Sequence, residues 1–118
     1  MYYTYMIRVE GGALYTGIAK DPFRRMREHM GRGKACARYT RSRRITALEA
    51  LWSSADRASA SRLEYALKTL AKPQKEALIR TPALLSALLP RIEKEDFVFH
   101  PKACLALFLG ETDLTRLP

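Results

Sequence analysis

The chain has 118 residues, a length that fits one domain with its own core. Hydrophobic residues make up 47% and charged residues 28%, which is typical of a globular protein and argues against a disordered one. The apolar runs are short and interrupted by charge, and the first residues lack a signal-peptide pattern, so we expect a soluble, cytoplasmic protein. Cys36 and Cys104 lie far apart in the sequence, and the chain has only two histidines. This argues against a zinc site and favours two reduced thiols.

The positive charge is concentrated in one stretch. The net charge is +9, and between Lys20 and Arg44 ten basic residues face only two acidic ones. A local excess of this kind indicates a polyanionic partner, although a cationic surface that only keeps a protein soluble is the alternative. Tyr39 lies among the arginines, where an aromatic ring could stack on a base. We favour nucleic acid over a membrane surface because the stretch lacks a broad apolar face.

The chain begins with a pattern typical of a β-hairpin. Residues Tyr2 to Val9 alternate, with Tyr3, Tyr5, Ile7 and Val9 on one face, which predicts a strand. Gly11-Gly12 supplies the turn, and Ala13 to Ala19 is the predicted returning strand.

A helix is predicted next, with Asp21 as its N-cap and Pro22 at its first position. It runs to about Met30 and packs Phe23, Met26 and Met30 inward, and the glycines that follow end it. The basic segment from Arg32 to Arg44 shows no period and is predicted as a loop.

The middle of the chain predicts a third strand, Ile45 to Trp52, and a helix capped by Ser54 or Asp56 that runs to about Leu70. The apolar stripe of this helix has helical spacing and comprises Ala60, Leu63, Leu67 and Leu70. Glu64 and Lys68 form an i,i+4 pair at the edge of the stripe.

The remaining elements are shorter. We expect helices at Gln74 to Arg80 and from Pro82 to Leu89, a short strand at Asp96 to His100, and either strand or helix at Cys104 to Leu109. The fold class is therefore α/β of the α+β type, with a small three-stranded antiparallel sheet flanked by helices. The leucines 84, 85, 88 and 89 could serve an interaction surface, although core packing is the more common use.

Several side chains could act together on a phosphodiester. Tyr5 and Tyr15 lie on adjacent predicted strands, Arg25 and His29 lie one helical turn apart, and a later helix carries Glu64. Cleavage needs an activated water, a cation for the developing charge, a stabilised leaving oxygen and usually a metal ion. These residue types can supply each role, but their presence alone is weak evidence, since both tyrosines could equally be ordinary strand aromatics and Glu64 a surface ion-pair partner.

Order and spacing strengthen the case. The segments that carry it are Tyr3-Thr4-Tyr5 within Tyr3 to Arg8, Leu14-Tyr15-Thr16-Gly17-Ile18, Arg25 to His29, Tyr39-Thr40-Arg41, and the helix with Glu64. In this order they resemble the GIY-YIG endonuclease superfamily, most closely its small stand-alone bacterial members. The resemblance covers Met1 to about Arg80, so we expect a GIY-YIG-like nuclease domain at 1–80 and a C-terminal extension at 81–118. The extension either packs on the domain or serves an interaction such as a homodimer.

The resemblance implies an endonuclease that hydrolyses DNA with Mg²⁺ or Mn²⁺, structure-selective with low sequence specificity, in repair or recombination. It implies a catalytic set of Tyr5, Tyr15, Arg25, His29 and Glu64, with Glu64 binding the metal. Nucleic-acid contacts are expected from Lys34, Arg38, Tyr39, Arg41, Arg43, Arg44 and Lys68. The alternative is a non-catalytic nucleic-acid-binding module on the same scaffold.

Overall fold

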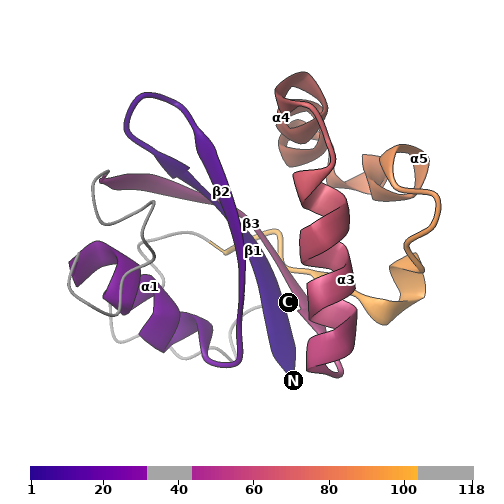
Figure 1. Cartoon of the computed structure of the whole chain (residues 1–118), viewed down its shortest axis with the longest axis horizontal. Helices are drawn as coiled ribbons and strands as arrows, with labels where there is room; N and C mark the ends of the chain where they lie inside the picture. Colours follow the sequence, from indigo (N-terminus) through magenta and orange to yellow (C-terminus); the bar gives the residue numbers. More distant parts are fainter. Residues whose placement is uncertain (32–43, 104–118) are drawn as a thin grey trace.

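The computed structural model describes residues 1–31 and 44–103, except the side chains of residues 23, 29 and 30. Its centre is a four-stranded antiparallel sheet with the order β2-β1-β3-β4 (Figure 1). The long strands are β1 (Tyr2–Val9), β2 (Leu14–Ala19) and β3 (Ile45–Ser54), and β4 (Val98–Phe99) pairs with the end of β3. The α+β class and the predicted hairpin are confirmed.

The hairpin brings Tyr5 opposite Gly17. The turn between β1 and β2 holds Gly11 and Gly12 at φ values of 90° and 91°, a region that glycine enters without a steric penalty. The register then pairs Tyr5 with Gly17 and Ile7 with Tyr15. Residues directly opposite each other in an antiparallel pair point to the same face, so Tyr5 and Tyr15 share one face of the sheet.

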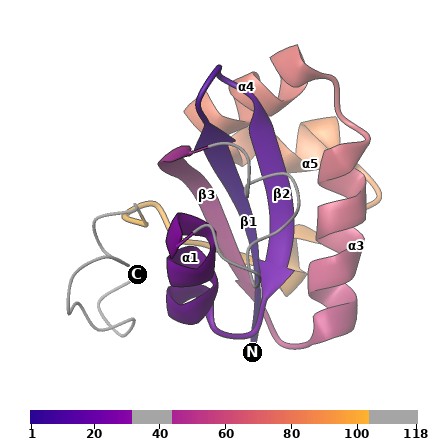
Figure 2. The ribbon, with the colours of Figure 1, turned by 60° about the vertical axis from the view of Figure 1, so that its left-hand side comes forward.

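Helices cover both faces of the sheet (Figures 1 and 2). Helix α1 (Pro22–Gly31) lies on the face of Tyr3, Tyr5, Ile7 and Val9, where Met26 is buried against them. Helix α3 (Arg57–Lys68) covers the other face through the predicted stripe, which is buried with Met6 and Trp52. The Thr4 hydroxyl donates to the Ala60 carbonyl oxygen over 3.1 Å and ties β1 to α3.

Both predicted N-caps are present. The Asp21 carboxylate accepts from the Arg24 backbone N–H at 3.1 Å, and Asp56 accepts from the Ser59 N–H at 2.8 Å. Each cap satisfies a backbone donor that the first helical turn leaves open. The two caps therefore set where α1 and α3 begin, next to the ends of β2 and β3.

The later elements differ in part from the prediction. The sheet has four strands instead of three, because β4 pairs with the edge of β3. Strand β4 is shorter than the strand predicted at 96–100, since the first residue of that range belongs to a 3-10 turn, η2 (Lys94–Asp96). Helix α4 (Lys72–Arg80) follows the expected course. The predicted helix at 82–89 divides into η1 (Pro82–Leu84) and α5 (Leu85–Leu88), since the Leu84 N–H bonds to the Thr81 carbonyl three residues back.

The leucines of this region belong to the core. Leu85 and Leu89 are buried in the cluster that also holds Leu63 and Leu67, and Leu84 and Leu88 pack against it. Of the two uses considered for these leucines, core packing is the one that the structure shows. None of the helices in the described part of the chain is long and apolar enough to cross a membrane.

Arg8 joins three elements in a way that the sequence did not indicate. Its guanidinium donates to Glu49 on β3 at 2.7 Å, to both carboxylate oxygens of Glu76 on α4 at 2.8 and 2.5 Å, and to the Gly12 carbonyl at 2.9 Å. The bonds to Glu76 and Glu49 raise the pKa of Arg8, and Arg8 in turn lowers the pKa of Glu76. A bidentate pair of this kind fixes orientation as well as charge, so Arg8 holds α4 against the hairpin.

Candidate functional site

The Tyr5 ring lies directly on Gly17. A Cβ added at Gly17 would come within 2.5 Å of the Tyr5 hydroxyl oxygen and 2.7 Å of Cζ, distances that real side chains do not show. Glycine is therefore required here because an aromatic ring occupies the space over the neighbouring strand. The Tyr5 side chain is almost fully buried, with 1% of its surface exposed.

The Tyr5 hydroxyl holds Arg25 of α1. The guanidinium hydrogen-bonds to Tyr5, and Nη1 also lies 3.0 Å from the Glu28 carboxylate. Burial lowers the pKa of Arg25, but the bonds to Tyr5 and Glu28 outweigh it, so the net direction is upward. Arg25 is thus a fixed cation, held from the sheet by Tyr5 and along its own helix by Glu28.

The same environment keeps Tyr5 neutral. Burial raises the pKa of Tyr5 well above the usual value of a phenol, and the bond from Arg25 only partly offsets it. Tyr15 lies beside it, with the two ring centroids 6.4 Å apart, and is half-buried rather than enclosed. Of the two tyrosines, Tyr15 is therefore the one whose side chain solvent reaches.

Glu64 approaches this cluster from α3. Helix α3 runs alongside β2, the edge strand that carries Tyr15 and Gly17 (Figure 2). The Glu64 carboxylate is close enough to Tyr5 to raise its pKa, and it pairs with Lys68 at 3.4 Å. The predicted surface ion pair with Lys68 is therefore present, and the Glu64 side chain remains 25% exposed.

The donor set suits a metal ion that keeps its waters. Within residues 1–31 and 44–103, no cluster of three His, Cys, Asp or Glu side chains could enclose an ion. Glu64 would supply one carboxylate oxygen ligand, and Mg²⁺ is commonly held by one or two carboxylates together with water and substrate phosphate. Among the described residues, Glu64 is a carboxylate beside this cluster that such an ion could bind.

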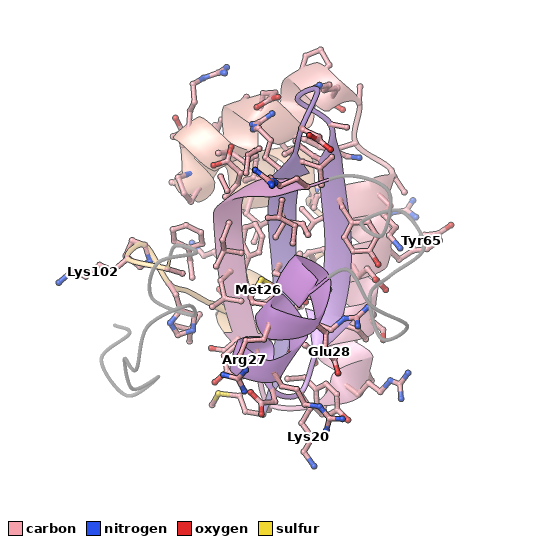
Figure 3. The ribbon with its side chains drawn as sticks, turned by 90° about the vertical axis from the view of Figure 1, so that its left-hand side faces the viewer. Lys20, Met26, Arg27, Glu28, Tyr65 and Lys102 are labelled. Atoms are coloured by element: carbon pink, nitrogen blue, oxygen red, sulfur yellow. The ribbon has the colours of Figure 1, made fainter. Side chains whose placement is uncertain are left out.

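An open depression of about 720 Å³ adjoins Arg25. Charged side chains of α1 and of the segment before it line one part of the depression. The rest is mainly apolar and is lined by Met1, Tyr3, Ile18, Ala19 and Pro22. Figure 3 shows Glu28 on the side of α1 nearer α3 and Lys20 at the end of the molecule where α1 begins. A chain-like substrate thus has an open approach to Arg25.

Comparison with known proteins shows the family of the chain. The model of the GIY-YIG catalytic domain matches residues 1–77. The chain belongs to the GIY-YIG family. A UPF0213 protein of Serratia liquefaciens is 41% identical over 93 residues, which are 78% of this chain and 89% of the relative.

Two further relatives carry the same family name. The UPF0213 protein YhbQ of Salmonella typhimurium is 40% identical over 80% of this chain and 97% of its own. A UPF0213 protein of Fusobacterium nucleatum is 38% identical over 69% of this chain and 79% of its own. No solved structure gives a significant match. Membership places the chain in a nuclease family for which DNA is the implied substrate.

Within this GIY-YIG domain the structure brings four predicted site residues together: Tyr5, Tyr15, Arg25 and Glu64. His29 follows Arg25 by one turn of α1, but its side chain lies outside the described residues. Lys68 lies at the site through its ion pair with Glu64.

The predicted nucleic-acid contacts are only partly described. Lys34, Arg38, Tyr39, Arg41 and Arg43 lie outside the described residues. Arg44 is exposed at the hairpin end of the sheet, where its N–H donates to the Glu10 carboxylate at 2.9 Å. Its neighbour Ile45 pairs with Val9, about 13 Å along β1 from Tyr5. The structure does not bring Arg44 next to the tyrosines.

Sequence reasoning missed Glu28. The only signal for it was its i,i+3 spacing from Arg25, which many helix-surface pairs share. In the structure it accepts from Arg25 at 3.0 Å and from Arg24 at 3.3 Å, and Arg25 lowers its pKa. Glu28 is the group that fixes Arg25 from the helix side.

Proposed function

We propose that this chain is a metal-dependent endonuclease that hydrolyses phosphodiester bonds in DNA. The observation that carries the proposal is the convergence of Tyr5, Arg25 and Glu64 from three separate elements at one edge of the sheet. A fixed cation beside a carboxylate and a phenol can fill roles that phosphodiester hydrolysis needs.

Arg25 would neutralise the charge that develops on the phosphate in the transition state. Its orientation is set beforehand by Tyr5 and Glu28, so little reorganisation is needed during the reaction. In this scheme Tyr5 is a positioning residue, because its buried hydroxyl is already bonded to Arg25.

Tyr15 is the phenol that would orient the attacking water. It is half-buried beside Tyr5 and opposite Ile7, where solvent can reach it. His29, one turn after Arg25, would assist at the water or at the phosphate.

Glu64 would hold one Mg²⁺ or Mn²⁺, which supplies Lewis-acid stabilisation of the phosphate when bound. The Lys68–Glu64 ion pair would open, so that Glu64 binds the metal and Lys68 contacts a phosphate. Both side chains are partly exposed, which leaves them room to move. The basic residues of the 32–44 segment, Arg44 included, would contact the phosphate backbone of the DNA without reading its base sequence.

Branched, nicked or single-stranded DNA is the substrate class that we favour, in repair or recombination. The described molecule measures 36 × 31 × 24 Å, which leaves little surface for reading a long sequence. The net charge of +9 favours binding to any phosphate backbone, so low sequence specificity follows. Action on cellular DNA would place the enzyme in the cytoplasm.

The test is cleavage of end-labelled branched and single-stranded DNA with Mg²⁺ or Mn²⁺, using wild type, Arg25→Ala and Arg80→Ala. Arg80 is exposed at the end of α4 and serves as the charge-matched control. We expect wild type and Arg80→Ala to cleave the DNA, and EDTA to abolish this cleavage. The cleavage rate of Arg25→Ala should be lower by about 100-fold or more. Salt-sensitive binding without cleavage under either metal would support the non-catalytic binding module instead.

A further inference from the structure

A second hollow of about 610 Å³ lies along the outer side of α3. Its walls are mainly apolar, from Ala66 on α3, from Leu88 at the end of α5, and from Leu89, Pro90 and Ile92 after it. Tyr65 stands at its side with 75% of its surface exposed. None of the described residues that line this groove is acidic, whereas Arg62 and Arg91 both line it.

An exposed aromatic ring, an apolar wall and two cations match the parts of a nucleotide. The ring and wall offer surfaces on which a base can stack, and the guanidinium groups offer partners for the phosphates on either side. A protein partner would have to bring acidic groups to the two arginines. The two arginines and the lack of acidic residues among the described lining of the groove therefore favour a polyanion.

The groove and the candidate site share helix α3. Tyr65 follows Glu64 directly, so it projects about 100° further round the helix axis, and Lys68 lies between the two directions. Figure 3 shows Tyr65 pointing outward from α3, away from the sheet. A strand bound at the candidate site would therefore pass Lys68 before it reaches Tyr65.

We propose that Tyr65 and this groove bind an unpaired base next to the phosphate that is cleaved. The inference rests on the proposed function for its location and deepens it, because it names single-stranded DNA, or a frayed end at a branch, as the substrate that the enzyme holds. Arg62, which donates to the Ser59 hydroxyl at 3.0 Å, and Arg91 would hold the flanking phosphates.

The experiment measures binding without cleavage. A fluorescent single-stranded oligonucleotide of about 12 nucleotides is titrated in EDTA with wild type, Tyr65→Ala, Tyr65→Phe and Val98→Ala. Val98 is also an exposed apolar side chain, 55% exposed on β4, and serves as the control. We expect binding about 10-fold weaker for Tyr65→Ala and unchanged for the other two, because Phe keeps the stacking ring.

A second probe reports stacking itself. The same oligonucleotide with 2-aminopurine at one position should lose fluorescence with wild type and Tyr65→Phe but not with Tyr65→Ala. Equal affinities and equal quenching for all variants would overturn the inference. The inference would also be overturned if Tyr65→Ala changed the oligomeric state in size-exclusion chromatography while its DNA binding stayed the same. The groove would then be a contact between copies of the chain.

Failure of this inference is distinguishable from failure of the proposed function. If wild type binds DNA through Tyr65 but never cleaves it, the base-binding groove is supported and the nuclease proposal is contradicted. If wild type cleaves DNA and Tyr65→Ala binds it as tightly as wild type, the nuclease proposal is supported and the base-binding groove is contradicted.

Discussion

At the scale of single residues, the site depends on Gly17 being glycine. We expect Gly17→Ala to displace the Tyr5 ring, because the new Cβ would lie 2.5 Å from its hydroxyl oxygen. The displaced hydroxyl could no longer hold Arg25, so the cleavage rate should fall on the order of 100-fold, with a loss of about 1–3 kcal/mol in the free energy of unfolding. Single-turnover cleavage and urea unfolding measure the two effects.

Tyr5→Phe is the matched comparison, since it keeps the ring and removes only the hydroxyl that bonds to Arg25. It should lower the rate with a smaller effect on stability. An undiminished rate in Gly17→Ala would show that Tyr5 does not need its observed position.

The motifs name the four side chains that the structure brings together, but not the groups that hold them in place. Tyr5, Tyr15, Arg25 and Glu64 were found because their order along the chain is informative. Glu28 was missed because an acidic residue three positions after an arginine is common on helix surfaces. Arg8 was noted only as part of a motif, since its partners Glu49 and Glu76 are distant in sequence and meet it only in the fold.

At the scale of elements, the Arg8–Glu76 pair that joins β1 to α4 should make stability depend on pH. Arg8 holds the pKa of Glu76 below its ordinary value of 4.5. The pair therefore stabilises the fold fully above about pH 5, and this contribution is lost as the pH falls through the lowered pKa. Glu76→Gln should cost about 1–2 kcal/mol at pH 7 and close to nothing at the lowest pH at which the fold persists.

Chemical denaturation of wild type and Glu76→Gln across this pH range measures the difference. Glu95→Gln, an exposed acidic residue on η2, provides the control and should follow wild type throughout. A cost that does not change with pH would contradict the assigned ion pair.

The described part of the C-terminal extension is predicted to be necessary for the fold. Leu85 is 7% exposed in the cluster that holds Leu63 and Leu67 of α3. Leu85→Ala should cost about 2–5 kcal/mol in the free energy of unfolding, measured by urea denaturation. Ser86→Ala, at an exposed neighbouring position, should change little, and equal stability of the two variants would argue that the region after Arg80 packs loosely.

The long elements could be predicted because their apolar spacing has a clear period, as in Tyr3 to Val9 and Ala60 to Leu70. The short ones could not. Strand β4 has two residues, too few to show alternation, and its place beside β3 depends on Trp52 meeting Phe99 with ring centroids 5.5 Å apart. The turn at Pro82 was expected as α-helix because proline marks a start without specifying the hydrogen-bond spacing that follows.

At the scale of the whole molecule, the charge of +9 predicts salt-dependent DNA binding. If the basic surface engages on the order of four phosphates of a single strand, a plot of log affinity against log salt should have a slope of about −3. Affinities for oligonucleotides of different sequence should differ little. Fluorescence anisotropy at several salt concentrations measures both, and a slope near zero would contradict phosphate-dominated binding.

The measurement that tests the central claim most directly is single-turnover DNA cleavage in Mg²⁺ by wild type, Glu64→Gln and Glu95→Gln. Glutamine keeps the size of Glu64 but removes the charge that would hold the metal ion. We predict that Glu64→Gln loses at least about 100-fold in rate while it still binds DNA, and that Glu95→Gln cleaves like wild type. Full cleavage by Glu64→Gln would contradict a metal-dependent site at the junction of α3 and β2.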